Sequence, residues 1–90
     1  MTFTWDPRKD VANQRKHGVG FREAATVLRD TLSTTYPDPT HSRGEQRHVT
    51  IGRSRLGRTL VVAHAERAGT IRIISARPAT PRERRFYEEG

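Results

Sequence analysis

The sequence contains no cysteine and no long apolar run, and only 32% of its residues are hydrophobic. The missing cysteine excludes a disulfide framework and a thiolate metal site, and it suits a reducing compartment. No apolar run approaches the roughly 18 residues that span a bilayer, and the first ten residues lack the layout of a signal peptide. Since 90 residues support one modest core, we expect one domain over residues 1–90, located in the cytoplasm with no membrane partner.

Acidic residues are also in short supply, with 10 Asp and Glu against 17 Lys and Arg, a net charge of +7. The surplus is uneven, because residues 1–40 carry a net charge of +1 and residues 41–90 carry +6. Every basic residue of the second part is an arginine, whose planar donor group binds phosphate through two hydrogen bonds and stacks on bases. This pattern favours a nucleic acid as the partner.

Helix boundaries are clear in the first third of the chain. Asp6 followed by proline is an N-cap with proline in the first helical position, and Gly18 is a stop signal, so we expect a helix over 7–17. The segment FREAATVLRD has apolar residues at helical spacing and predicts a second, short helix. In front of both, the alternating residues 3–5 predict a short strand.

The rest of the chain reads as a long connection followed by strands. Residues 31–45 are rich in Ser, Thr, Pro and Asp and predict a connection with a few extended residues. The segments EQRHVTIGRS, RTLVVAHAER and TIRIISAR then predict three strands of an antiparallel meander. Thr80 to Glu83 form a capping box that begins a helix through about residue 89. The expected fold is α+β, in the order β-α-α-β-β-β-α, with an antiparallel sheet and helices packed on one face.

The link between the last two strands decides which side chains share a face of the sheet. A three-residue loop at 67–69 fits a type I turn with a bulge better than a two-residue loop does. A slip of one residue would exchange the two faces. In the three-residue register, one face carries Val61, Ala63, Ala65, Ile71, Ile73, Ser75 and Arg77.

Several stretches together resemble the BrnT family of toxins from type II toxin–antitoxin systems. They are FTWDPRK, NQRKHGVGFREAATVLRD, DPTHSRGEQR, IGRSRLGRTLVV and ER-x-x-TIRIISARPATPRERRFYE, and they cover nearly the whole chain. The most specific element is IRIISAR followed by A-T-x-x-E-R and a tyrosine.

The resemblance implies a RelE-like fold and a ribonuclease that inhibits translation. It further implies a BrnA-like antitoxin with a ribbon-helix-helix domain. The toxin would bind operator DNA and repress the operon only as a complex with this antitoxin. It matches Arg67 and Arg77 to the positions most often held responsible for activity in such toxins, and Lys16, His17 and Tyr87 to further family positions. No cofactor and no metal are expected.

RNA cleavage without a metal needs a base for the 2′-hydroxyl, an acid for the 5′-oxygen and cations around the transition state. Arg67 and Arg77 suit the last role, because arginine stays protonated and can bind two phosphate oxygens. The alternative for each is a salt bridge or a solvated strand end. Along the strands the two could lie more than about 20 Å apart, so they need not contact one phosphate.

Candidates for acid and base are His17, Lys16, His64, Glu66, Glu83 and Tyr87. Histidine is the side chain that exchanges protons most readily near neutral pH, which favours His17, but a Lys-His-Gly sequence is also an ordinary helix stop. His64 fits a satisfied sheet histidine, and Glu83 fits the glutamate of the capping box. Tyr87 could stack on a base or hold the last helix against the sheet.

The remaining arginines predict a rim that contacts the RNA backbone without reading its sequence. His41 and His48 show no spacing that suggests metal ligands. Two further hypotheses stay open: a basic module that binds RNA or DNA without cleaving it, and a structural partner that only co-represses with its antitoxin. The predicted rim consists of Arg53, Arg55 and Arg58 around the SRLG turn and Arg82, Arg84 and Arg85 on the last helix.

Overall fold

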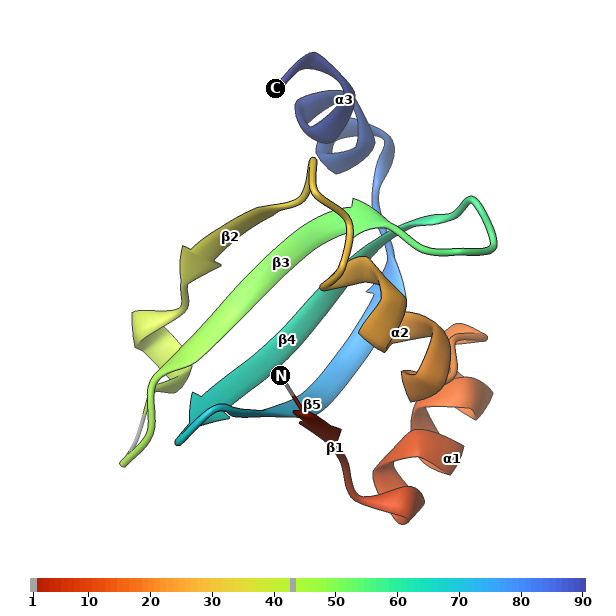
Figure 1. Ribbon diagram of the computed structural model, residues 1–90. Helices are drawn as coiled ribbons and strands as arrows, with labels where there is room; N and C mark the ends of the chain where they lie inside the picture. Colours follow the sequence, from red (N-terminus) through yellow and green to blue (C-terminus); the bar gives the residue numbers. More distant parts are fainter. Residues whose placement is uncertain (1, 43) are drawn as a thin grey trace.

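The computed structural model describes residues 2–42 and 44–90, in which a five-stranded sheet is flanked by helices (Figure 1). The strand order is β1-β5-β4-β3-β2; β1 pairs in parallel with β5, whereas the other neighbours pair antiparallel. The α+β class is therefore confirmed. The elements are β1 (Thr2–Thr4), α1 (Pro7–His17), α2 (Phe21–Val27), β2 (Thr34–Pro37), the 3-10 helix η1 (Pro39–His41), β3 (Arg47–Arg53), β4 (Thr59–Arg67), β5 (Thr70–Pro78) and α3 (Pro81–Glu89).

The helix ends follow from local sequence signals. Asp6 caps α1 by accepting a hydrogen bond from the backbone N–H of Arg8, and Gly18 ends the helix in the left-handed region at φ 69°. At the other end of the chain, Thr80 and Glu83 form both hydrogen bonds of the capping box of α3. These boundaries agree with the sequence prediction, because caps depend on residues within one turn of each other.

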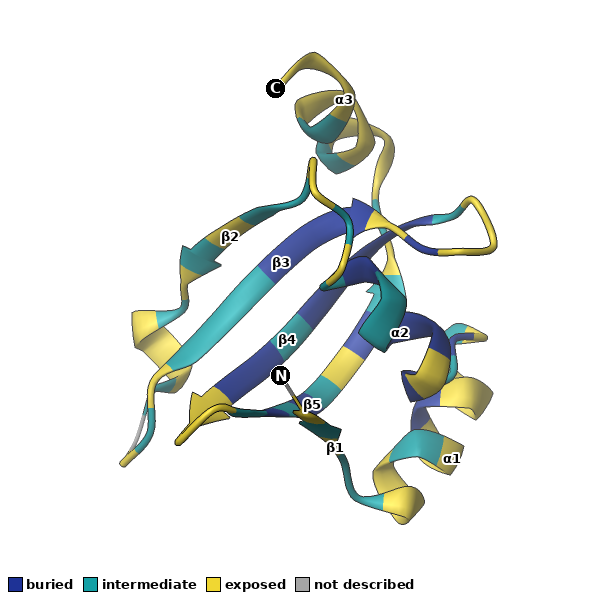
Figure 2. Cartoon of the chain, viewed as in Figure 1, coloured by how far each residue is buried: buried dark blue, intermediate teal, exposed yellow. Residues whose placement is uncertain are grey.

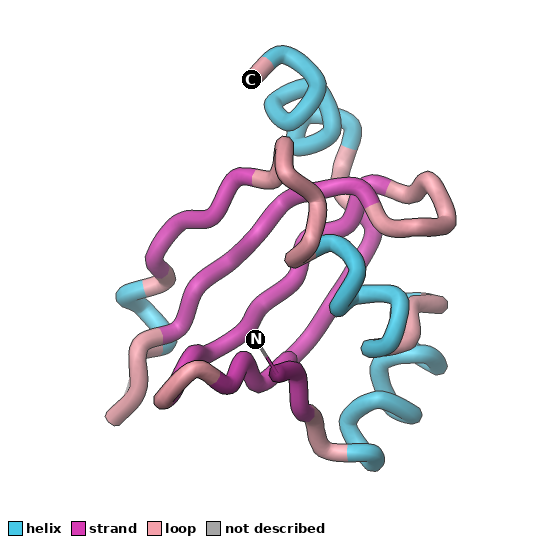
Figure 3. The backbone as a smooth tube through the Cα atoms, viewed as in Figure 1, coloured by secondary structure: helices cyan, strands magenta, loops and turns pink. Residues whose placement is uncertain are grey.

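The predicted element order and sheet type need correction. The extended residues expected within the long connection form a full edge strand, β2, which pairs with β3. The sheet is mixed and not antiparallel throughout, since β1 joins it beside β5. The trace in Figure 3 places α1 and α2 together on one side, whereas α3 lies beyond the ends of the strands and not on that face. Sequence patterns of single segments carry little information on such long-range pairing.

The β4–β5 register also differs from the prediction. The loop has two residues, Ala68 and Gly69, both with positive φ, so Arg67 pairs with Thr70. A β-bulge between Ala63 and His64 then shifts the register. As a result Ile71 and Ile73 do not share the face of Ser75 and Arg77. The prediction that all four lie on one face is wrong. Pairing after the bulge sets Ala63 opposite Ser75 and Val61 opposite Arg77.

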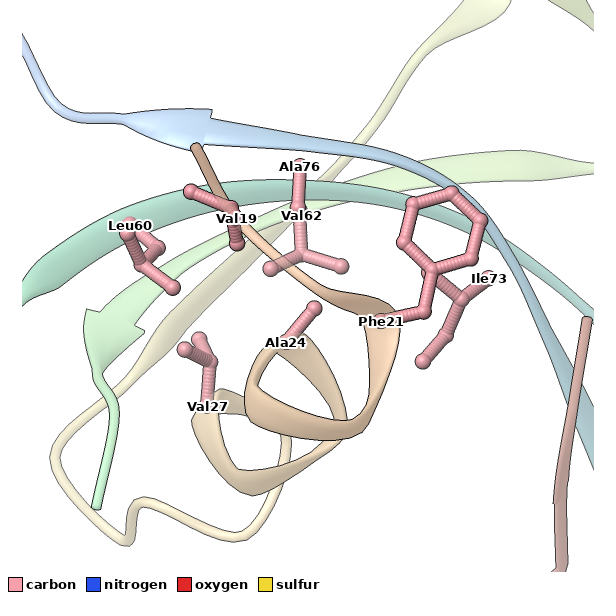
Figure 4. Packing of buried hydrophobic residues seen from close by; sticks show 8 residues of the cluster. All are labelled: Val19, Phe21, Ala24, Val27, Leu60, Val62, Ile73 and Ala76. Carbon is pink, nitrogen blue, oxygen red and sulfur yellow. The ribbon is translucent and has the colours of Figure 1, made fainter. Parts of the chain in front are cut away.

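The core lies between α2 and one face of the sheet, which we call the covered face. Figure 4 shows the helix directing its apolar side chains at Leu60 and Val62 of β4 and at Ile73 and Ala76 of β5. Trp5 extends the cluster by packing its ring edge-on against Phe21, with centroids 6.4 Å apart. Figure 2 shows the burial concentrated along the central strands. The cluster consists of Val19, Phe21, Ala24, Val27, Leu60, Val62, Ile73 and Ala76.

The buried side chain of Asn13 joins α1 to the free part of the β5 edge. On β5, Ala76 lies beyond the residues that pair with β1. The amide nitrogen of Asn13 donates to the carbonyls of Ala76 and Val19 at 2.8 Å, and its oxygen accepts from the N–H of Ala76 at 3.2 Å. One side chain thus replaces part of a neighbouring strand and fixes the end of α1 beside β5. In the described part of the chain, no helix is long and apolar enough to cross a membrane.

Candidate active site

A cleft of about 360 Å³ lies on the face of the sheet opposite α2, which we call the open face. Its floor is apolar and consists of Val49, Val61, Ala63 and Ile74 from the three central strands. Alternate residues of these strands point into the core, as expected from the pleat. Titratable and charged groups surround this floor. The other lining residues are His17, Asp38, His41, Arg47, Ser75, Ala76 and Arg77.

Arg77 provides a fixed positive charge at one end of the cleft. Its Nη1 and Nη2 donate to the two carboxylate oxygens of Glu83 at 2.7 and 2.9 Å. These hydrogen bonds are the main reason why the pKa of Glu83 falls to about 2, and Glu83 in turn raises the pKa of Arg77. The bulge in β5 matters here, because without it the two-residue loop would pair Arg77 with Leu60 and place it on the covered face. The predicted site residue Arg77 therefore lies in the cleft.

Arg47 lies toward the other end of the cleft, where it pairs across the strands with Ala65, which in turn neighbours Arg72. Glu45 forms an ion pair with Arg72 and lies 3.8 Å from Nε of Arg47. That Nε atom is buried and has no hydrogen-bond partner among the described residues. Arg47 thus brings a second cation and an unused donor to the open face.

Two histidines reach the cleft from elements far apart in the sequence. His17 ends α1 beside β5, and His41 ends η1 between β2 and β3, toward the opposite edge of the sheet (Figure 1). The Nδ1 atom of His41 lies 2.9 Å from Oδ2 of Asp38. The cleft therefore holds two imidazoles and two guanidinium groups around an apolar floor, which is a suitable arrangement for proton transfer next to a bound phosphate.

Tyr87 is held away from the cleft. Its hydroxyl donates to Oδ2 of Asp30 at 2.5 Å, and this bond is the main cause that raises the pKa of Tyr87, followed by burial. The guanidinium of Arg53 lies 5.8 Å from the centre of the tyrosine ring. Asp30 also accepts from the backbone N–H groups of Leu32 and Arg53. Tyr87 thus attaches α3 to the segments around β2 and β3, which agrees with the alternative that it holds the last helix in place.

Arg67 and Lys16 also lie outside the cleft lining. Arg67 is exposed at the hairpin end of β4, opposite Thr70. It lies six residues along the strand from Val61, the partner of Arg77, which corresponds to roughly 20 Å. Lys16 is exposed on α1 next to His17. Of the five predicted catalytic residues, the structure brings His17 and Arg77 together and places Arg67, Lys16 and Tyr87 elsewhere.

Arg58, predicted as part of the RNA-binding rim, is bound within the fold. Its Nε and Nη2 donate to both oxygens of Glu23 at 3.0 and 2.5 Å, and Nη2 also donates to the carbonyl of Gly18. The hydroxyl of Ser54 donates to the same carboxylate. The hydrogen bonds from Arg58 are the main cause of the lowered pKa of Glu23, a residue only 9% exposed. The other predicted rim residues, Arg53, Arg55, Arg82, Arg84 and Arg85, are exposed.

His64 and His48 lie on the covered side, away from the cleft. The hydroxyl of Thr50 lies 2.7 Å from Nε2 of His64, and the two imidazole rings stack with centroids 6.0 Å apart. Burial lowers the pKa of His64 to about 4, with a smaller contribution from His48. His64 is thus a neutral, packed histidine, but the predicted satisfied sheet histidine is only partly correct, because its buried Nδ1 has no hydrogen-bond partner among the described residues. Within residues 2–42 and 44–90, no group of three His, Asp or Glu side chains is placed to hold a metal ion.

Sequence reasoning did not identify Asp38, His41 and Arg47 as site residues. Signals for them existed. Asp-Pro-Thr-His sets a carboxylate and an imidazole three residues apart, close enough to meet within one turn. Arg47 alternates with Val49 along β3, which places both on one face. The sequence did not show whether that face is the open one or the covered one. The sheet register decides this, and the register is known from the structure.

The sequence matches the model of a protein family described as ribonuclease toxin, BrnT, of type II toxin-antitoxin system, over residues 5–83. The fold is similar to a crystal structure of the Brucella abortus ribonuclease toxin, BrnT, with a TM-score of 0.70 and 23% sequence identity. The similarity covers 89% of this chain and 97% of that one, and at this identity it concerns the fold. No curated protein sequence matches the chain.

Proposed function

The chain belongs to the BrnT family of ribonuclease toxins of type II toxin–antitoxin systems, and from this premise we propose that it cleaves RNA, without a metal ion, in the cleft of its open face. The reaction is transesterification by the 2′-hydroxyl of the substrate, and cleavage inhibits translation. The fold is of the RelE-like type, and residues 1–90 act as one toxin domain.

The observation that carries this proposal is the meeting of two histidines and two arginines at one apolar cleft. Histidine exchanges protons most readily near neutral pH, and arginine keeps its charge at any pH that the protein meets. Together they supply the base, the acid and the cation that phosphodiester cleavage requires. His17 fills one of the proton-transfer roles and Arg77 the cationic role.

Arg77 is suited to phosphate binding because Glu83 fixes its guanidinium without using all of its donors. An arginine has five N–H groups. Two hydrogen bonds to Glu83 and a longer one to the carbonyl of Pro78 leave Nε–H and a second Nη2 hydrogen for a phosphate oxygen. A cation held in position before the substrate arrives stabilises the transition state more than a mobile one does. Arg67, at the far end of the hairpin, contacts the RNA chain away from the reacting phosphate.

The partners follow from the charge of the protein and from its family. A net charge of +7 accelerates association with RNA and with an acidic protein segment. We propose that a BrnA-like antitoxin with a ribbon-helix-helix domain neutralises the toxin in the cytoplasm. The two proteins bind operator DNA as a complex and repress their operon.

A non-catalytic RNA- or DNA-binding module is the alternative function. The observation that favours it is the exposed arginine surface formed by the β3–β4 turn and α3, which attracts any phosphate backbone. Such a module would retain labelled RNA in a salt-dependent manner and release no product. Catalysis and binding are thus distinguished by product formation on the same gel.

The test is cleavage of labelled RNA by the purified protein in the presence of EDTA. We expect product with a 2′,3′-cyclic phosphate end, and a loss of at least about 100-fold in rate for Arg77→Ala. Arg77→Lys keeps a charge but not the paired donors and should recover only part of the activity. Arg8→Ala removes an arginine whose side chain is 94% exposed and serves as the control with unchanged rate. Cleavage that stops with EDTA would contradict the metal-free mechanism.

A further inference from the structure

The pair formed by Asp38 and His41 is the part of the cleft that the sequence did not point to. Asp38 directly precedes η1 and His41 ends it, so one short turn of backbone fixes both side chains. Their contact, 2.9 Å between Oδ2 and Nδ1, is short enough for a charge-assisted hydrogen bond. Both residues line the cleft, together with His17 from the opposite edge of the sheet.

We propose that His41 is a further catalytic residue, the general base that removes the proton of the 2′-hydroxyl, and that Asp38 is its positioning residue. This inference rests on the proposed ribonuclease function and assigns the groups that carry it out. His17 is then the general acid for the leaving group.

The contact between the two residues determines which nitrogen of His41 can act. An ionised carboxylate only accepts hydrogen bonds, so the proton of the neutral imidazole is assigned to Nδ1. The lone pair then lies on Nε2, the nitrogen available to a substrate in the cleft. A base oriented by a third group in this way is the general arrangement of an activated nucleophile. Here the nucleophile belongs to the RNA, which explains why no serine or cysteine is needed.

Exposure allows His41 to meet substrate. Its side chain is 64% exposed, whereas that of Asp38 is only 21% exposed. The positioning group is therefore shielded and the reacting group accessible. The other titratable and charged groups that face the cleft are Arg47 on β3, Arg77 on β5 and His17 on α1.

Of the other acid–base candidates, Lys16 and Glu66 are exposed and lie outside the cleft lining, and the remaining three are already engaged in the fold. Glu83 is bound to Arg77 and to the backbone of Thr80. Tyr87 is bound to Asp30. His64 lies buried on the covered side. Among the described residues that line the cleft, the two histidines are thus the groups left for proton transfer.

The reaction balances with these two groups. Nε2 of His41 takes the proton of the 2′-hydroxyl, and the 2′-oxygen forms a bond to phosphorus. The bond between phosphorus and the 5′-oxygen breaks, and protonated His17 gives its proton to that oxygen. The products are a 2′,3′-cyclic phosphate and a 5′-hydroxyl. Arg77 and Arg47 balance the negative charge on the phosphorane in between.

The two roles can be separated with a pair of substrates. One is an RNA oligonucleotide with a natural 5′-oxygen at the cleavage site, and the other carries sulfur in that bridging position. Thiolate leaves without being protonated, so the second substrate needs a base but no acid. We expect His41→Ala to lose about 100-fold or more on both substrates, and His17→Ala to lose it on the oxygen substrate alone.

His48→Ala is the matched control, because His48 lies one strand position from Arg47 but on the covered side. It should cleave both substrates at the rate of the unmodified protein. Asp38→Asn keeps the size of the side chain and should lower the rate by about tenfold or more, by weakening the control over the His41 ring. It should also shift the acidic limb of the pH–rate profile, whereas a purely structural role of Asp38 would change thermal stability and leave that limb in place.

Three outcomes overturn the inference and leave the ribonuclease function standing. His41→Ala cleaving at the unmodified rate while Arg77→Ala is inactive would remove His41 from the reaction. Recovery of His41→Ala, and not of His17→Ala, on the sulfur substrate would reverse the base and acid. An acidic limb unmoved by Asp38→Asn would deny Asp38 its positioning role. Absence of cleavage by the unmodified protein, with RNA retained, would instead overturn the proposed function itself.

Discussion

The two faces of the sheet contain alternate residues of the same strands, yet they carry ionic groups in different ways. Each has a glutamate bound through two hydrogen bonds to an arginine. On the covered side, Glu23 is 9% exposed and also accepts from Ser54, and its arginine is Arg58. On the open side, the side chain of Glu83 is 26% exposed and its arginine, Arg77, lines the cleft. Similar chemistry thus serves stability on one side and leaves a cation accessible on the other.

The burial of the glutamate accounts for this difference. A carboxylate that has lost its water depends on its partner, so a buried pair cannot lose one member without a large cost. When a carboxylate keeps part of its hydration, removal of its partner lowers the stability of the fold less. We infer that selection for function can act on Arg77 with little loss of stability, whereas Arg58 is constrained by the fold.

The largest expected effect comes from breaking the covered pair. Arg58→Ala leaves the buried carboxylate of Glu23 without its main partner and should lower the free energy of unfolding by about 3 kcal/mol. Urea denaturation followed by circular dichroism measures this. Arg55→Ala, at an exposed position of the same turn, is the control and should change it by less than about 0.5 kcal/mol. Equal effects of the two variants would contradict the comparison.

Neighbouring valines of β4 test the same contrast without charge. Val62 is 0% exposed in the core, and Val61, at 7%, forms part of the cleft floor. Val62→Ala should cost about 2.5 kcal/mol in unfolding free energy, because it leaves a cavity among packed side chains. Val61→Ala should cost about 1 kcal/mol in unfolding free energy, because the Val61 side chain already borders the open cleft and its truncation leaves no enclosed cavity. A larger loss for Val61→Ala in urea denaturation would show that the open face, and not the covered one, carries the core.

Much of the fold was predictable wherever neighbouring residues determine it. The caps at Asp6, Gly18 and Thr80 set three helix ends, and the strand segments follow from their β-branched residues. Parallel pairing of β1 and the edge position of β2 depend on contacts across the sequence, which no local pattern encodes. The β4–β5 loop was mispredicted because Ala68 adopts φ 51°, a conformation that non-glycine residues rarely take.

The candidate site was predictable only in part for the same reason. His17 and Arg77 lie in motifs that the sequence displays, a helix stop and a strand end. His41 and Arg47 become site residues through the meeting of η1 and β3 with α1 across the sheet. Arg77 reached the correct face in the prediction through two errors that cancel, a loop one residue too long and a missing bulge. Its place in the cleft is therefore known from the structure and not from the pattern.

Two groups with lowered pKa values sharpen the comparison through the dependence of stability on pH, and their effects are the smallest at pH 7. Burial holds His64, on the covered side, at a pKa of about 4 against an ordinary 6.5, and Arg77 holds Glu83 at about 2 against 4.5. Both pKa values are lowered in the folded state, so the unfolded chain binds more protons and stability falls as pH falls. The contribution of His64 should disappear between pH 6.5 and 4, and that of Glu83 between pH 4.5 and 2.

His64→Gln should therefore flatten the upper part of the curve of unfolding free energy against pH, and Glu83→Gln the lower part. At pH 7, Glu83→Gln should cost about 1 kcal/mol, because its pair is partly hydrated. An unchanged slope between pH 6.5 and 4 in His64→Gln would mean that His64 is protonated in the folded protein, and the covered face would then carry an unpaired charge.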